Sequence, residues 1–368
     1  GGGEPGRQSL FTGAGASEKD TTWYLDGVTI THPETIGTAP AYIDVSFLEE
    51  VQVSVGGHDI TAQTGGTQLN FVTRKGGSRF SGGAYFSIED ETFEMNRDLP
   101  ASITDRGLGT PGIFSLYRYG GNVSGPIIKD KLWFSGSYAM QDIHARTIWQ
   151  TGDKIRLPGL YGKLDFRFGN TSGSLSYAGS SRRNRDRTWL PADSQDPAST
   201  WDQGEPFKLY AANIRQVFGD LTANLKAAYT ESRFTLDPAG CEVDPATGRL
   251  VGQDWFDYML PNRYFSGSLP YYNQGRKSLD LSLDCSYFSD VSLPGDHEIR
   301  FGVDYYAADT SSQTLYPNQR KLFIYDRNNP QGTKEIWWVQ DGAFAAGHER
   351  LSFYFSDTIT YGRLSAGL

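Results

Sequence analysis

Few residues in the sequence have the types and spacing that catalysis or cofactor binding requires. The opening Gly1–Gly6 matches the G-x-G-x-x-G letters of a dinucleotide-binding loop, but no apolar strand precedes it and Pro5 disrupts the turn into a helix. The five histidines, at positions 32, 58, 144, 297 and 348, offer no pair at the spacing of a zinc site, and no serine-hydrolase, phosphate-loop or zinc-protease motif occurs. We therefore expect no cofactor, no metal and no enzymatic reaction.

Acidic residues give weak candidates for calcium binding or sugar hydrolysis. The segment Asp326–Gly332 resembles a calcium loop, but Pro330 stands at a ligand position and the glycine comes one residue late, which favours an ordinary turn. The chain has 43 Asp and Glu residues, yet nothing in the sequence brings two of them together as a glycosidase pair requires. Neither pattern predicts a reaction.

A basic run is the first candidate binding surface. It comprises Arg182, Arg183, Arg185 and Arg187, at the outer end of a predicted strand. Guanidinium groups hold phosphates and carboxylates through paired hydrogen bonds, so the run is suited to lipopolysaccharide phosphates or to an anionic ligand. A solvated base of a loop explains the same residues equally well.

Aromatic residues in two long polar segments are the second candidate. The residues that we select for ligand contact are Trp255, Tyr258, Tyr271 and Tyr272 in segment 237–276, and Trp337 and Trp338 in segment 313–349. Aromatic rings with polar tips make good contact surfaces for ligands and partners. Packing within the loops, or a belt at a membrane interface, remains the alternative interpretation.

The composition limits the class of protein that carries these residues. Of the 368 residues 38% are hydrophobic, and the longest apolar runs have about four residues, whereas a membrane helix needs about 20. A membrane β-barrel stays possible, because its strands alternate apolar and polar residues and so have a low average hydropathy. The net charge of −9 argues against nucleic-acid binding. The two cysteines, Cys241 and Cys285, give no zinc motif or disulfide framework, and whether they pair is left open.

Alternation with a period of two residues predicts strands from about residue 79 onward. In the clearest case Leu279, Leu281 and Leu283 share one face, and the serines and aspartates between them share the other. Ten such segments are predicted, at 79–89, 113–124, 132–144, 159–168, 172–185, 208–218, 221–236, 277–290, 297–312 and 350–361, and an eleventh begins near Arg363. Most have at least the ~9–11 residues that a tilted strand needs to cross a bilayer.

The connections between these segments alternate in length. Short turns are expected at Gly125–Lys131, Gly169–Thr171, Gly219–Asp220, Val291–Asp296 and Gly362, and long loops at 90–112, 145–158, 186–207, 237–276 and 313–349. Short turns on one side and long loops on the other are typical of an outer-membrane barrel. The alternative, a soluble carbohydrate-binding β-sandwich, predicts extraction without detergent.

The first 75 residues differ from the rest and are expected to form a separate small αβ piece. They contain, in order, Tyr24–Val28 (YLDGV), Leu48–Val53 (LEEVQV) and Gly65–Gly77 (GGTQLNFVTRKGG), and Phe80–Phe86 (FSGGAYF) follows. Asp26-Gly27 is a turn dipeptide, and the paired glycines at 65–66 and 76–77 suit tight backbone corners. These motifs, in this order, resemble the second half of the plug domain of TonB-dependent outer-membrane receptors. Their sequences are similar to those of the Oar-like subfamily.

The resemblance implies an all-β-dominated fold with two parts. Residues 1–75 would be the C-terminal part of a plug domain, and residues 76–368 about ten antiparallel strands of a large, 22-stranded type of transmembrane β-barrel. Ten strands in about 285 residues extrapolate to roughly 600 residues for such a barrel. We therefore expect a partial chain, without the energy-coupling box and the first half of the plug.

The resemblance also implies a function and partners. The expected function is energy-coupled uptake of a scarce ligand, such as a siderophore, peptide or glycan, across the outer membrane of a Gram-negative-type bacterium. The expected partners are outer-membrane lipid and lipopolysaccharide, a TonB-type coupling protein, the remainder of the barrel and a surface lipoprotein. The alternative is a structural or adhesive outer-membrane barrel in a surface complex, without transport.

Overall fold

The computed structural model describes most of the chain. The described residues are 11–13, 15–56, 64–94, 98–105, 107–148, 152–188, 195–196, 198–259, 264–289, 295–325 and 334–367. The glycine-rich opening Gly1–Gly6, the loop Asp326–Gly332 and His58, which the sequence raised as candidate sites, lie outside these ranges. Among the described residues, no helix has both the length and the apolar character that crossing a membrane requires.

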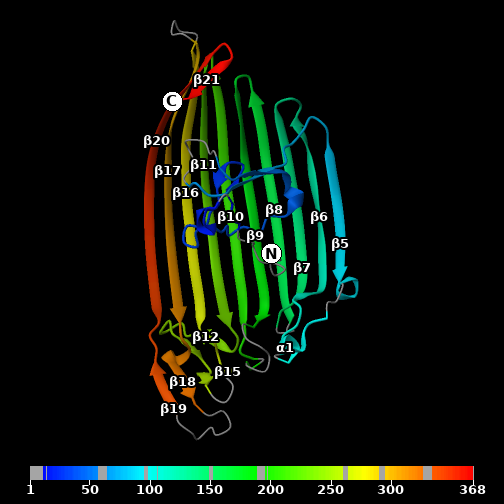
Figure 1. Cartoon of the computed structure of the whole chain (residues 1–368), viewed down its shortest axis with the longest axis vertical. Helices are drawn as coiled ribbons and strands as arrows, with labels where there is room; N and C mark the ends of the chain where they lie inside the picture. Colours follow the sequence, from blue (N-terminus) through cyan, green and yellow to red (C-terminus); the bar gives the residue numbers. More distant parts are fainter. Residues whose placement is uncertain are drawn as a thin grey trace.

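A single antiparallel sheet of eleven strands forms a tall, curved wall (Figure 1). Its order is β21-β20-β17-β16-β11-β10-β9-β8-β7-β6-β5, so each strand pairs with the neighbouring wall strands in the chain. The strands are β5 (Ser81–Asp90), β6 (Gly112–Ile128), β7 (Leu132–Arg146), β8 (Gly152–Phe168), β9 (Thr171–Arg187), β10 (Trp201–Phe218), β11 (Leu221–Pro238), β16 (Tyr271–Ser289), β17 (Asp296–Leu315), β20 (Gly342–Tyr361) and β21 (Leu364–Gly367). All eleven predicted strands are confirmed.

The two faces of the wall differ as the alternation predicted. On β16, Leu279, Leu281 and Leu283 point outward and are 36–38% exposed. The polar residues between them, including Asp280 and Asp284, line the inner face, which also carries the N-terminal part of the chain. An apolar outer face and a polar inner face are what a barrel wall in lipid requires.

The strands are longer than predicted at the end that carries the long loops. Residues 152–158, 201–207, 271–276 and 342–349, which we assigned to loops, are strand. In this part of β8 the outer residues Lys154 and Arg156 are polar, and the inner residues Ile155 and Leu157 are apolar and buried. The alternation is therefore reversed relative to the lipid-facing part, although backbone pairing continues. At the opposite end, two-residue turns begin at Gly169, Gly219 and Gly362 with φ of 57–59°, as their sequences predicted.

The long loops carry secondary structure of their own. Two of them join in a small sheet of order β15-β14-β18-β19, at the lower end of Figure 1, where β14 and β18 run parallel. The elements are β12 (Cys241–Val243), β13 (Leu250–Gly252), β14 (Trp255–Tyr258), β15 (Tyr264–Ser266), β18 (Arg320–Ile324), β19 (Lys334–Trp338), the 3₁₀ turns η3 (Glu91–Phe93) and η4 (Pro317–Gln319), and the short helix α1 (Ala101–Thr104). The described residues of segments 237–276 and 313–349 therefore include several strands.

The N-terminal part is a second, four-stranded sheet of order β2-β1-β4-β3. Its elements are η1 (Glu18–Asp20), β1 (Thr22–Leu25), β2 (Val28–Thr29), η2 (Val45–Phe47), β3 (Leu48–Ser54) and β4 (Gln68–Thr73). The strands overlap the motifs Tyr24–Val28, Leu48–Val53 and Gly65–Gly77, and β1 and β4 are parallel. The expected αβ character is wrong for the described residues of this part, which contain 3₁₀ turns and no α-helix, because the apolar runs are too short and glycine-interrupted for one.

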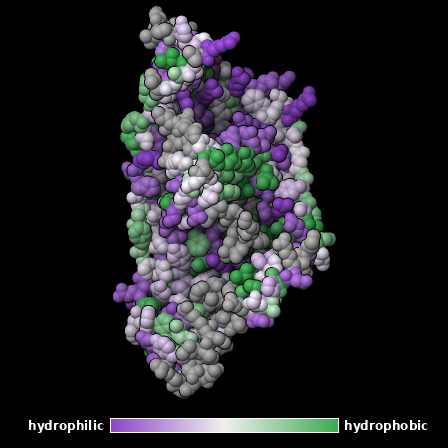
Figure 2. Space-filling view, in the orientation of Figure 1, coloured by the Kyte–Doolittle hydropathy of each residue, from purple (hydrophilic) through white to green (hydrophobic). Residues whose placement is uncertain are grey.

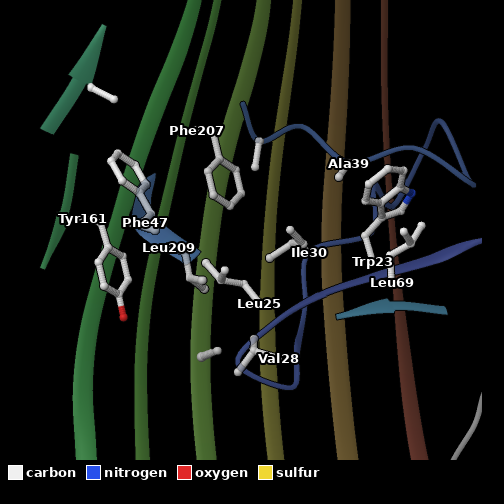
Figure 3. Close-up of a cluster of buried hydrophobic side chains, with 14 residues drawn as sticks. Trp23, Leu25, Val28, Ile30, Ala39, Phe47, Leu69, Tyr161, Phe207 and Leu209 are labelled. Atoms are coloured by element: carbon white, nitrogen blue, oxygen red, sulfur yellow. The ribbon is translucent and has the colours of Figure 1, made fainter. Parts of the chain in front are cut away.

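The main hydrophobic core lies between this small sheet and the wall (Figure 3). Trp23, Leu25 and Val28 come from the small sheet, and Phe207 and Leu209 come from β10; each is at most 6% exposed. Each such side chain stabilises the assembly by about 1.5–3 kcal/mol. The small sheet therefore sits on the wall through a true core, and Figure 2 shows this face as largely hydrophilic around a compact hydrophobic patch.

Candidate functional site

The candidate site is the set of contacts through which the small sheet is seated on the inner face of the wall. Its first element is the tight turn between β1 and β2. Asp26 and Gly27 are the two loop residues between β1 and β2, with φ of 50° and 77°. Both angles are left-handed, the geometry of the two-residue turn for which Asp-Gly is preferred. The side-chain oxygen Oδ1 of Asn70 accepts the N–H of Gly27. The turn directs the Asp26 carboxylate toward β4 and the wall.

A buried ion pair connects Asp26 to the wall. The ammonium of Lys163 on β8, whose side chain is 4% exposed, lies 2.8 Å from Asp26 Oδ2 and donates also to the hydroxyl of Thr73 at 3.1 Å. Thr73 in turn donates its N–H and its hydroxyl to Asp26, at 2.8 and 2.5 Å, and accepts from Tyr161 OH at 2.5 Å. Each polar atom of this network therefore has a partner, which offsets the desolvation of the charges.

The chain leaves the small sheet through a second group of contacts. Ser135 donates to the carbonyl of Arg74 at 3.0 Å, and the N–H of Gly76 donates to Asp165 Oδ2 at 3.4 Å. Gly76 has no room for a side chain, because a Cβ would lie 2.6 Å from Trp133 Cβ and 2.7 Å from the carbonyl of Phe134. A tight corner was predicted here, and close approach to β7 is its cause.

Two residues, Glu34 and Tyr42, fix the loop between β2 and η2 through four hydrogen bonds. Glu34 accepts from Arg276 Nε at 3.2 Å and from Gln274 Nε2 at 2.9 Å, both on β16. Tyr42 donates its hydroxyl to Glu205 on β10, and its backbone N–H donates to Ser180 Oγ at 3.0 Å. The small sheet is thus attached to β7, β8, β9, β10 and β16 across its width.

His32 holds the start of this loop in shape. Its ring nitrogen Nδ1 accepts the backbone N–H groups of Glu34 and Thr35, at 3.2 and 2.7 Å. Burial, and secondly the positive charge of Arg276, lower the pKa of His32 from 6.5 to about 3. The imidazole is therefore neutral at ordinary pH and acts as an acceptor in a structural turn.

A polar cavity of about 960 Å³ remains beside the Asp26-Gly27 turn. Its wall residues carry both charges, and include Arg215 and Lys226 near the turn, Asp280 and Asp284 on β16, and Arg350 on β20. Arg350 pairs with Asp304 at 2.8 Å, and Tyr354 donates to Asp284 at 2.6 Å. A second polar cavity of about 780 Å³ lies on the side next to β8, where Asp26, Lys163 and Asp165 line it. Space for water and polar solutes therefore remains on both sides of the turn.

The four arginines of the predicted basic run are divided between the two faces of β9. Arg182 points inward, is 4% exposed, and lies 3.8 Å from Glu205. Arg183 and Arg185 point outward and are exposed, and Arg187 at the strand end is half-buried. The run is therefore not one surface, because successive side chains of a strand point to opposite faces.

The predicted aromatic residues also differ in environment. The ring of Trp255 lies 6.0 Å from that of Phe265 in a tilted arrangement and 3.9 Å from the ammonium of Lys321. The ring centroids of Trp337 and Phe323 are 4.6 Å apart. Tyr258 contacts Phe256 and Tyr264, Tyr272 contacts Phe234, and Tyr271 begins β16. Trp338 is 76% exposed on the edge strand β19. Most of these rings build the loop sheet.

The sequence patterns did not identify the residues that seat the small sheet. Lys163, Glu34 and Arg276 were not selected, although Lys163 lay on the polar face of a predicted strand. Within the described ranges, no group of three or more His, Cys, Asp and Glu residues could hold a metal ion. Both cysteines are free thiols.

Comparison with known proteins gives partial relatives. No family model matches the chain. The TonB-dependent transporter Oar of Myxococcus xanthus is 29% identical over 143 residues, which are 37% of this chain and 13% of Oar.

Solved structures match over nearly all of the chain. The outer membrane transporter YddB of Escherichia coli has a TM-score of 0.70 at 12% identity, with 96% of this chain and 48% of YddB covered. FpvA of Pseudomonas aeruginosa, solved bound to pyoverdines, has 0.62 at 14%, with 94% and 44% covered. The siderophore receptor PirA of Acinetobacter baumannii has 0.56 at 11%, with 94% and 52% covered.

The chain spans about half the length of these solved proteins. At such identities the structural likeness shows the fold, a plug sheet on a barrel wall. The chain is thus similar to TonB-dependent outer-membrane receptors, and the small sheet occupies the place of part of their plug.

Proposed function

We propose that the chain forms the plug and adjoining barrel wall of a receptor that takes up a scarce ligand across the outer membrane by energy coupling. The observation that carries this proposal is the plug sheet, seated on the inner wall by the Asp26–Lys163 network and by a shared core. In this proposal residues 1–75 belong to the plug and residues 76–368 to the wall. A TonB-type partner, acting on a segment of the plug, supplies the energy.

Uptake requires a route past the plug, and the polar cavity supports one. The cavity of about 960 Å³ borders the plug hairpin on one side and strands β11, β16, β17 and β20 on the other. Its lining carries both charges and hydroxyl groups, which suit a hydrated polar ligand. PirA is a siderophore receptor and FpvA was solved bound to pyoverdines, and both support siderophore-like ligands among the candidates.

Arg182 is the predicted ligand residue that the geometry favours most. It lies on the inner face beside Tyr42 and Glu205 of the plug seat, and its Nε and Nη2 atoms have no hydrogen-bond partner among the described residues. These two atoms form the edge of the guanidinium that binds an oxyanion in paired fashion. We propose that an acidic group of the ligand reaches this edge when the plug moves.

The test compares the source strain with a strain that lacks the receptor. Depletion of small molecules from culture medium is measured by mass spectrometry, with and without a protonophore. We expect at least one compound that only the receptor strain depletes, and only while energised. If both strains deplete the same compounds while surface assembly differs, the structural or adhesive barrel is the function instead. Arg182→Gln should slow depletion, whereas Arg183→Gln, on the opposite face, is its matched control.

A further inference from the structure

A compact basic patch lies on the outer face of the wall, opposite the side that carries the plug. It consists of Lys154 and Arg156 on β8 and Arg183 and Arg185 on β9. All four side chains are exposed, whereas the residues between them on each strand point inward and are buried. The register places Lys154 opposite Arg185 and Arg156 opposite Arg183. Two cross-strand pairs of like charge therefore stand side by side.

This pairing differs from the other basic residues on the same outer face. Lys208 on β10 stands opposite Glu231 on β11, which in turn stands opposite Lys277 on β16, and Lys277 also faces Asp309 on β17. Opposite charges across strands stabilise a sheet, and like charges directly opposite destabilise it. In the β8–β9 patch only Arg156 has an acidic residue opposite it, Asp142 on β7, so Lys154, Arg183 and Arg185 call for another anionic partner.

Acids of the wall neutralise only part of the patch. Arg156 Nε lies 3.0 Å from Asp142 on β7. Asp186 and Asp202 lie on the loop side of the patch, where the N–H of Asp186 donates to Asp202. Within the part of the chain that the structure describes, Lys154, Arg183 and Arg185 form no ion pair and no side-chain hydrogen bond. At least three cations are therefore available to an external anion.

The position of the patch along β8, relative to the apolar residues of the outer face, indicates where such an anion would be. The apolar outer residues of β8 run from Leu160 to Phe168, both about half exposed. Eight residues span ~26 Å along a strand, and about 20 Å across the membrane at the usual tilt, which fits an apolar band of about 25 Å. Arg156 lies four residues beyond Leu160 on the side of the long loops. The patch thus lies at the level of the outer-leaflet head groups.

We propose that this patch binds the phosphate groups of a phosphorylated glycolipid in the outer leaflet. Arginine side chains hold a phosphate through two parallel hydrogen bonds, and lysine adds a point charge. The two cross-strand pairs are separated by about 7 Å along the strands, so each pair can hold one phosphate of a doubly phosphorylated head group. The glycolipid then supplies the counter-charge that the sheet lacks, and binding stabilises the wall.

The experiment uses the receptor purified in a neutral detergent. Thermal unfolding is measured with no lipid, with bisphosphorylated lipid A, with dephosphorylated lipid A, and with inorganic phosphate at equal phosphorus concentration. Arg183→Gln/Arg185→Gln is compared with Lys208→Gln/Lys277→Gln, which removes the same charge from the acid-paired part of the wall. Affinity for lipid A is measured in parallel by native mass spectrometry.

We expect bisphosphorylated lipid A alone to raise the unfolding temperature of the wild-type protein and of the control variant. The Arg183→Gln/Arg185→Gln variant should bind lipid A roughly tenfold more weakly for each arginine that is replaced. Without lipid, it should unfold at the same or a higher temperature than wild type, because the repulsion is relieved.

Three results would overturn the proposal. Equal stabilisation by inorganic phosphate would show a general anion site, and equal binding of dephosphorylated lipid A would show an apolar contact. A lower unfolding temperature of the arginine variant without lipid would show that these residues serve the fold. A variant that loses ligand uptake but still binds lipid A would bear on the proposed transport function and not on the lipid-binding proposal.

Discussion

The ion pair between Asp26 and Lys163 gives the sharpest test of how the plug is seated. Two variants break the pair from opposite sides. Asp26→Asn keeps the shape of the side chain and suits the left-handed turn, since Asn tolerates φ near 50°. Lys163→Met keeps the length of the lysine side chain without its charge. Both leave Tyr161 and Thr73 in place.

The two variants should differ because the two charges are buried to different depths. The Lys163 side chain is 4% exposed and the Asp26 side chain 24%. Asp26→Asn leaves the deeper charge without its counterion, which costs about 3–5 kcal/mol in known buried pairs. Lys163→Met leaves Asp26 with partial solvent and two hydrogen bonds from Thr73, so the loss is about 1.5–3 kcal/mol. Asp26→Asn should therefore be the more damaging single change.

Hydrogen exchange of the plug measures this difference locally. The amide of Thr73 donates to Asp26 Oδ1, so its exchange reports the opening of the seat. Each 1.4 kcal/mol raises the opening population about tenfold, which predicts at least a hundredfold faster exchange for Asp26→Asn. Glu49→Gln on the exposed strand β3 removes one plug charge away from the wall and should leave exchange unchanged.

The combined variant tests the coupling between the two groups. With both charges removed, the loss should be smaller than the sum of the single losses by about 1–3 kcal/mol. Strict additivity, or a larger effect of Lys163→Met than of Asp26→Asn, would refute the view that a desolvated ion pair seats the plug.

Three further changes test other parts of the structure. Gly76→Ala should destabilise the plug by about 1–3 kcal/mol, because its Cβ would lie 2.6 Å from Trp133 Cβ. Gly77→Ala should have no such effect, because no atom lies within 4 Å of the added Cβ. Heat-modified mobility in gels compares the two variants. The pKa of His32 is lowered from 6.5 to about 3, so between these values only the unfolded protein takes up its proton. Folding stability therefore falls as pH falls below 6.5, by about 2 kcal/mol at pH 5. His32→Asn should remove this pH dependence of the unfolding temperature, and an unchanged pH dependence contradicts the prediction. Trp337→Ala should destabilise the loop sheet by about 1 kcal/mol, because it removes the ring that packs against Phe323. Trp338→Ala should not, because Trp338 is exposed. Limited proteolysis measures the difference, and equal cleavage of both variants contradicts the prediction.

The wall could be predicted from the sequence because a single physical rule governs it. Lipid on one side and polar plug or water on the other impose alternation, as in Leu279 to Leu283 with Asp280 and Ser282 between them. Above the lipid the outer face of a strand becomes polar, as at Lys154 and Arg156, while inner residues such as Ile155 can stay buried. The pattern of apolar residues facing lipid then ends, and the extensions beginning at Gly152 and Gly342 were predicted as loops.

The plug seat could be predicted only in part. The Asp26-Gly27 turn follows from local sequence, because few other pairs accept two left-handed residues in succession. The partner of Asp26 does not, since Lys163 is 137 residues away and reaches the carboxylate only after β8 has paired within the wall. The register of the wall strands and the position of the plug along them decide which inward-pointing charge contacts which plug residue. Neither property can be predicted from a short segment of sequence.

The basic run on β9 shows how register divides one sequence signal into two functions. A row of arginines in a loop would form one flexible surface, but on a strand the alternation assigns Arg182 to the lumen and Arg183 and Arg185 to the outer face. The inner arginine lies against Glu205 beside the plug, where it can act only on what the barrel contains. The outer pair meets Arg156 and Lys154 across the strand and can act only on what surrounds the barrel. A one-residue shift in pairing would exchange these roles, so changes that alter lipid binding and changes that alter uptake should map to alternate residues of this strand.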